Sequence, residues 1–327
     1  MLQNWSSGTN WLPSDRILNS RIVRFIIGEH IDGVPTEFFV HEEAIAQLSK
    51  PLNALLRGSM QEAREACVKW EKVDKATFER FVQFAYTGDY TAPQAHLQSD
   101  KNDSVQACPP PEIEVPTKLS AIIAAKKWLR ENEASWNPPE IQPVPTFSSL
   151  EFPFPDSRTA LGKSCEPAAF NSEIGYLDVF LGHSALYILG DFKLIDSLKA
   201  IALHRLHKTL CLFSLNDKNA ADVIDLARYV YTEEGSGGTS GEQMSPLRML
   251  VCEYMASNAS VFIQNLGFMT KLAEGGEFAQ DFVKIMVQRK KKRWKYTAAG
   301  RGESYRRPHW IFRAIRIVPS SLAPSLK

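Results

Sequence analysis

The sequence predicts an α+β fold, a small sheet edged by helices, on three observations. Runs rich in β-branched and aromatic residues alternate with helical apolar stripes over the first ninety residues. Twelve of the nineteen prolines fall between residues 91 and 172, where this alternation stops. Beyond residue 174 the apolar positions follow helical spacing. We therefore expect an N-terminal segment at 1–19, domain halves at 20–90 and 173–213, an insert at 91–172, a helical extension at 214–288 and a basic tail at 289–327.

The first two strands are predicted to form a hairpin. Ile22–Ile27 is rich in β-branched residues, ends at Gly28 and precedes the turn-like sequence Asp32–Pro35. Thr36–His41 then supplies a second run of strand-forming residues. This order of strand, turn and strand is typical of an antiparallel pair.

Two short helices are expected over residues 42–57. Pro51 follows Ser49 and Lys50, which suits the first turn of a second helix, because the missing proline N–H is not needed there. The apolar residues that fall at helical spacing are Ala44, Ile45, Leu48, Leu52, Leu55 and Leu56.

A third strand is expected at Ala66–Trp70, followed by a helix that Asp74 caps and Gly88 ends. Phe78, Phe81, Val82 and Ala85 form one stripe of this helix, and we interpret the stripe as core.

The proline-rich insert at 91–172 is predicted to be disordered and to project from the domain surface, with one possible short helix at Thr117–Asn132. Ile174–Leu189 then reads as a buried helix that is apolar on most sides. The helical segments expected after it are Phe192–Phe213, Val223–Val230, Leu247–Tyr254 with Ser245 and Pro246 at its start, and Phe278–Met286, with a flexible linker at Gly235–Gly241.

The order of these segments resembles the BTB/POZ domain, and in particular its fungal-type branch. The resemblance rests on Phe38–Ile45, Val68–Asp74 with a tryptophan in the third strand, and the ending Tyr-Thr-Gly-Asp-Tyr at Tyr86–Tyr90. Leu247–Val251 also resembles the helical extension of fungal-type members. The positions that would match the fold signature of the family are His41, Ser49, Trp70, Phe78, Phe81 and Gly88.

The resemblance implies protein–protein interaction rather than catalysis. Members of the family form homodimers or heteromers, and many are substrate adaptors that join a cullin scaffold in ubiquitin ligases. Ile45, Leu48, Leu52 and Leu55 would then contribute to the dimer or core surface, and Tyr86 and Tyr90 would lie near a surface that faces the cullin.

No residue pattern predicts an enzyme, a metal site or a cofactor. Gly162-Lys163-Ser164 lacks the glycine that a phosphate loop needs at position 157, where this chain has Ser157. His204 and His207 have no acidic or cysteine partner at ligand spacing. We assign His41 a structural role in capping and packing rather than one in acid–base chemistry. The neighbours His183 and Ser184 cannot form a nucleophile pair, because successive helix residues point about 100° apart.

The net charge of +1 hides an asymmetry along the chain. From Arg289 to Lys327 there are twelve basic residues and one acid, so the tail carries +11 and the remaining residues −10. The run Arg289, Lys290, Lys291, Lys292 and Arg293 fits a nuclear localisation signal, a nucleic-acid patch or a solvated tail. Translation of non-coding sequence after about residue 290 is a fourth interpretation. Nucleic acid is the less favoured partner, and a nuclear regulator that dimerises is the alternative function.

The cysteines and the hydropathy indicate the compartment. Five scattered cysteines without a Cys-x-x-Cys pair are typical of a reducing environment. The start of the chain has no signal-peptide pattern, and no apolar run is long enough to cross a bilayer. We therefore expect a protein of the cytoplasm, the nucleus or both, with no membrane partner.

Overall fold

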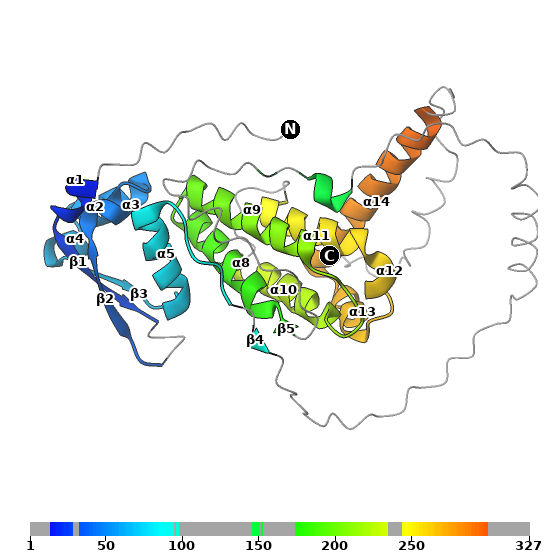
Figure 1. Cartoon of the computed structure of the whole chain (residues 1–327), viewed down its shortest axis with the longest axis horizontal. Coiled ribbons are helices and arrows are strands. Elements are labelled where there is room, and N and C mark those ends of the chain that lie inside the picture. Colours follow the sequence, from blue (N-terminus) through cyan, green and yellow to red (C-terminus); the bar gives the residue numbers. More distant parts are fainter. Residues whose placement is uncertain are drawn as a thin grey trace, which may run out of the picture. The chain divides into compact units, whose positions relative to one another are not determined.

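The computed structural model describes residues 14–28, 33–94, 96–97, 146–150, 152, 174–234 and 244–299. The described residues up to 97 and those from 146 to 286 form one compact unit. Its architecture is mixed, with a three-stranded sheet and many helices (Figure 1). The predicted helix at Thr117–Asn132, the sequence Gly162–Ser164 and the linker at Gly235–Gly241 lie outside the described residues.

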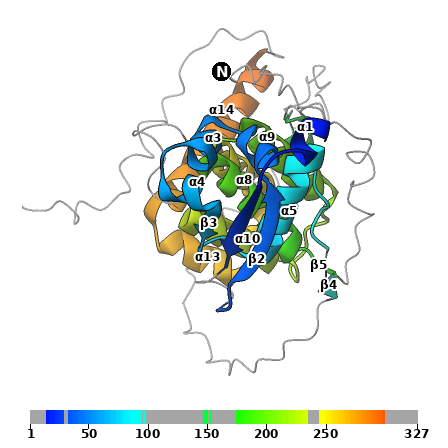
Figure 2. The ribbon, with the colours of Figure 1, turned by 90° about the vertical axis from the view of Figure 1, so that its left-hand side faces the viewer.

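The predicted hairpin is confirmed. β1 (Ile22–Ile27) pairs antiparallel with β2 (Thr36–His41), so that Ile22 lies opposite His41 and Ile27 opposite Thr36. β3 (Cys67–Trp70) pairs parallel with β1 on its other side, which gives the order β2-β1-β3. Figure 2 shows β1 and β2 in the foreground.

Five helices, α1–α5, precede, separate or follow the three strands of this sheet along the chain. The side chain of Ser49 accepts a hydrogen bond from the Leu52 N–H, and Pro51 lies in the first turn of α3, as expected. α1 and α4 were not predicted, because each is only five residues long and shows no apolar stripe. The bounds are α1 (Ser14–Leu18), α2 (Glu42–Ala46), α3 (Lys50–Arg57), α4 (Gln61–Glu65) and α5 (Lys75–Thr87).

Both ends of α5 follow the sequence prediction. The Asp74 carboxylate accepts a hydrogen bond from the Thr77 N–H at 2.8 Å, and the helix ends at Gly88 with φ of 78°. The buried face of α5 joins an aromatic core against the sheet: the rings of Phe78 and Phe25 are 5.2 Å apart, and those of Phe78 and Trp70 are 5.7 Å apart.

Parts of the proline-rich segment contribute to the ordered structure. β4 (His96–Leu97) pairs antiparallel with β5 (Ile174–Gly175), and η2 (Phe147–Ser149) is a short 3₁₀ helix. We expected this segment to project from the domain. For residues 146–150 that expectation is wrong, because Phe147 is buried and packs on the helices that follow.

The remaining elements form a helical layer whose main helices were predicted. Phe180 and Leu186 are fully buried in α8, in keeping with a helix that is apolar on most sides. α12 and α13 were not expected as separate helices. The bounds are α8 (Leu177–Phe192), α9 (Asp196–Leu212), α10 (Ala220–Glu233), α11 (Pro246–Ser257), α12 (Ala259–Phe262), α13 (Leu266–Ala273) and α14 (Gly276–Ala299).

The segment after α5 joins the N-terminal half to α8 and α9. Arg205 Nη2 lies 2.5 Å from Asp89 Oδ1, and a second guanidinium N–H donates to the Tyr90 carbonyl. A Cβ at Gly182 would lie 2.3 Å from Cγ of Pro93, so the chain can cross α8 this closely only at a glycine. The residues before and after the insert therefore share buried contacts.

Candidate protein-interaction surface

The structure places most residues of the expected interaction set in the core. Ile45, Leu48 and Leu52 are buried, and Leu55 is partly buried against the same core. Of the two roles expected for these residues, the core role is the one that the structure assigns to Ile45, Leu48 and Leu52. They therefore offer a partner no surface in this fold.

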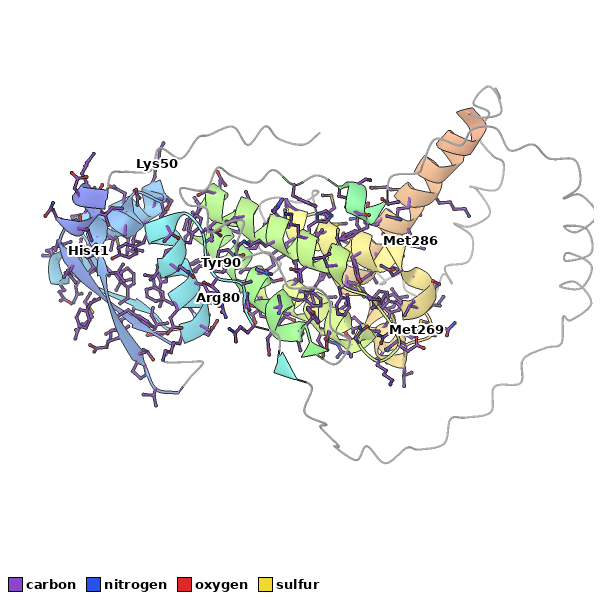
Figure 3. All side chains as sticks on the ribbon, in the orientation of Figure 1. His41, Lys50, Arg80, Tyr90, Met269 and Met286 are labelled. Atoms are coloured by element: carbon purple, nitrogen blue, oxygen red, sulfur yellow. The ribbon has the colours of Figure 1, made fainter. Side chains whose placement is uncertain are left out.

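The two tyrosines also differ from the expectation. Tyr90 is 1% exposed, with its ring beneath the Arg205 guanidinium at 4.6 Å and its hydroxyl 2.9 Å from His183 Nδ1. Figure 3 shows it between α5 and the helices that follow. The Tyr90 side chain therefore offers a partner no exposed surface in this fold, and its position near a cullin-facing surface stays a prediction. The hydroxyl of Tyr86 accepts a hydrogen bond from the His41 N–H at 2.9 Å and lies 2.7 Å from His41 Nδ1.

The other signature positions have structural roles in this fold. Trp70, Phe78 and Phe81 are buried in the aromatic core. His41 precedes α2, but its side chain makes no capping hydrogen bond, so the expected capping role is wrong. The expected packing role is confirmed, because the His41 ring packs against that of Tyr86. Figure 3 labels His41 in the part of the structure that carries the three-stranded sheet.

A surface that the interaction set missed lies on the outer face of the sheet. Strand residues alternate between faces, and the buried face carries Val23 and Phe25. The opposite face carries Ile22 and Phe39, which are 54% and 69% exposed and lie diagonally across the β1–β2 pair. The sequence carried part of the signal, because two adjacent phenylalanines in one strand must point to opposite faces, but it does not show which of them faces solvent.

Charged side chains surround these apolar residues. Arg24 lies opposite Phe39 in the register, and its guanidinium is 3.5 Å from the Glu37 carboxylate and 3.6 Å from Cys67 Sγ. Lys69 is exposed on the neighbouring strand β3. The outer face is thus an apolar patch with a charged border, a pattern found at protein-binding surfaces.

The outer edge of β2 has free backbone groups as well. The Arg24 N–H donates to the Ala66 carbonyl at 2.8 Å, on the β3 side, so Arg24 and Phe39 form a non-hydrogen-bonded pair. The N–H and C=O of Phe39 therefore point away from β1, and by alternation those of Glu37 do too. No described strand pairs with this edge. This row of outward-pointing backbone groups ends at His41, whose N–H already donates a hydrogen bond to the Tyr86 hydroxyl.

Three histidines that were candidates for chemistry have hydrogen-bond partners within the fold. His204 Nδ1 and His207 Nε2 lie 3.0 and 3.1 Å from the carbonyl oxygens of Phe152 and Phe147. Cys211 Sγ lies 3.4 Å from His207 Nε2, so the expectation that no cysteine accompanies these histidines at ligand spacing is wrong. His183 is bonded to Tyr90, while the hydroxyl of Ser184 is buried without a hydrogen-bond partner. Within the described ranges, no three His, Cys, Asp or Glu side chains gather closely enough to hold a metal ion.

The basic run begins inside α14. Arg289 is partly buried and Lys290 is exposed, whereas the side chains from residue 291 onward lie outside those described. Its role as a localisation signal stays a prediction. Among the helices of the described residues, none has the length and hydropathy that a bilayer crossing requires.

No family model, curated protein or solved structure matches the chain. The resemblance to the BTB/POZ domain therefore stays a prediction that rests on the residues quoted for it. Independently of that resemblance, the small sheet has an exposed apolar face, a charged border and an edge with which no described strand pairs.

Proposed function

We propose that this protein is a non-enzymatic interaction module that associates with a second copy of itself through the β2 edge and the outer face of the sheet. The exposure of Phe39, at 69% on the same face as the 54% exposed Ile22, is the observation that carries the proposal. An unpaired strand edge beside an exposed aromatic is unfavourable in a monomer, because both features attract further strands. A partner that covers both removes this cost.

The open backbone groups define a register for the proposed dimer. A two-fold axis at Phe38 would pair β2 antiparallel with its copy and place Glu37 of each chain opposite Phe39 of the other. Both positions have outward N–H and C=O groups, so the two chains can exchange hydrogen bonds. Arg24, already paired with Glu37, would border the phenylalanine of the partner.

The wider role follows from the resemblance to the BTB/POZ domain. As part of the proposal, the module acts in the cytoplasm or the nucleus, and the adaptor role on a cullin scaffold is the cellular task that the family suggests. The alternative, a nuclear regulator that dimerises and uses the tail from Arg289 for localisation or nucleic-acid binding, is favoured by the charge of +11 on that tail.

Light scattering and sedimentation of the full chain test self-association. We expect a concentration-dependent dimer for the wild type. Phe39→Ser should raise the dimer dissociation constant at least about tenfold, because two exposed rings per dimer lose their apolar contact. Phe192→Ser is the matched control, since Phe192 is 77% exposed at the end of α8 and belongs to neither strand of the β1–β2 pair.

Two results would contradict the proposal. One is a wild-type protein that stays monomeric up to high micromolar concentration. The other is equal weakening of the dimer by Phe39→Ser and by Phe192→Ser, which would show a response to any lost surface phenylalanine. Far-UV circular dichroism of both variants checks that each keeps its fold.

A further inference from the structure

A short piece of the proline-rich segment lies on the helical layer like a bound peptide. Residues 146–150 and 152, here called the aromatic segment, contact α9 and α11 through η2. Phe147 is 8% exposed, while Leu150 and Phe152 are partly buried against the core. The serines between them are exposed.

The backbone of the aromatic segment is held by two histidines of α9. His207 Nε2 donates to the Phe147 carbonyl at 3.1 Å, and His204 Nδ1 donates to the Phe152 carbonyl at 3.0 Å. Because a carbonyl oxygen only accepts, each of these nitrogens must carry the proton. Burial lowers the pKa of both imidazoles, although the bond to each carbonyl opposes the shift. Each ring is therefore neutral near pH 7.

The rings of the aromatic segment pack against the same two helices. The Phe147 ring lies 5.0 Å from that of His207 and 5.1 Å, edge-on, from that of Tyr254 in α11. The Phe152 ring also packs on His207, and the centroids of these two rings are 4.9 Å apart. His207 thus contacts both phenylalanine rings and donates a hydrogen bond to the Phe147 carbonyl. Cys211 Sγ lies 3.4 Å from the same Nε2.

These contacts recognise features that any peptide of suitable sequence can supply. Two backbone carbonyls and two aromatic rings five positions apart provide the specific contacts, with a partly buried leucine between them. The exposed side chains of Ser148 and Ser149 form hydrogen bonds to Thr146, within the segment. The site therefore selects a short pattern, Phe-x-x-Leu-x-Phe, rather than a unique sequence.

We propose that the surface of α9 and α11 around His204, His207 and Tyr254 is a peptide-binding site for partner segments with this pattern, and that Phe147–Phe152 occupies it as an intramolecular competitor. A tethered ligand competes at a high effective concentration, so an external peptide binds the wild-type protein weakly and binds well once the aromatic segment is displaced. This site is separate from the β2 edge, and either proposal can fail alone.

Fluorescence anisotropy with a labelled peptide that copies residues 144–154 tests the site on the full-length chain. Phe147→Ala combined with Phe152→Ala should bind the peptide at least about tenfold more tightly than the wild type does. A peptide in which the residues that match Phe147 and Phe152 are alanine should not bind. Adding His207→Ala to the double variant should weaken binding about tenfold. Ser148→Ala is the matched control and should bind as weakly as the wild type.

A folded double variant that does not bind the peptide would overturn the proposal. If the double variant loses its fold, a measurement on the wild type decides instead. A copy of the peptide with a photoreactive benzophenone at the Phe147 position should cross-link saturably to α9 or α11, and unlabelled peptide should compete. Cross-linking that does not saturate, or that maps elsewhere, would show that Phe147–Phe152 is simply part of the core.

Discussion

His183 is the residue with the clearest pH signature in the described chain. It is 1% exposed in α8, and its Nδ1 lies 2.9 Å from the Tyr90 hydroxyl. Burial lowers the pKa of His183 to about 3, and the nearby charges of Arg205 and Arg80 act in the same direction. The imidazole is thus neutral in the folded protein, whereas it takes up a proton below about pH 6.5 when unfolded.

This difference sets the sign of the pH dependence. Between about pH 6.5 and 3 the unfolded chain binds one more proton than the folded chain, so the contribution of His183 is fully present above pH 6.5 and is lost as the pH falls. In urea unfolding at a series of pH values, His183→Gln should flatten the acid-side slope by up to about 1.4 kcal/mol per pH unit. An unchanged slope would show that His183 is not buried as a neutral ring.

At the scale of single elements, helix starts illustrate what a local contact contributes. Asp74 accepts a hydrogen bond from the Thr77 N–H at the start of α5, whereas Met60 occupies the same position of α4 without any side-chain bond. Asp74→Ala should lower the free energy of unfolding by about 1 kcal/mol in urea titrations. Met60→Ala is the matched control and should change it by less than about 0.5 kcal/mol. Equal effects would argue against capping as the cause.

Most of the helices that the sequence predicted are longer than those it missed, and local residues rather than tertiary contacts specify them. α5 and α11 have caps and apolar stripes within their own residues, so local sequence is enough to predict them. α4 and α12 have five and four residues, too few for a stripe or for stability as isolated helices. Such elements form only because the rest of the fold holds them, and no local pattern predicts that.

At the scale of the whole molecule, one buried ion pair joins residues that are far apart in the sequence. Asp89 is 1% exposed and Arg205 is 6% exposed, and their charged atoms are 2.5 Å apart. Burial raises the pKa of Asp89, and the Arg205 guanidinium opposes that shift. Removing one partner leaves the other charge in a site with little water to solvate it.

Asp89→Asn should therefore lower the free energy of unfolding by about 3–5 kcal/mol. The matched control is Asp225→Asn, because Asp225 and Arg228 form an exposed pair at 3.1 Å whose loss should cost less than about 1 kcal/mol. Hydrogen exchange should show that Asp89→Asn weakens protection in both β1 and α10, since the pair connects their halves. Loss of protection in one half alone would mean that the halves unfold independently.

For the candidate surface, the sequence predicts which residues share a face but not which face is exposed. The alternation of β2 implies that Phe38 and Phe39 face opposite ways, but not which of them faces solvent. Helical spacing marked Ile45 and Leu48 as one apolar face, and that face was equally compatible with a core or a dimer contact. The choice depends on what packs against each face, and those residues come from elsewhere in the chain.

By itself, the sequence determined the mixed class, the hairpin, the third strand, the main helices and the caps of α5 and α11, because strand alternation, helical spacing and capping act over a few neighbouring residues. Only the tertiary structure decided that Tyr90 is buried, that Phe39 is exposed and that Phe147 packs on α9 and α11. Each of these outcomes depends on contacts between segments many residues apart, for which a single chain carries no local signal.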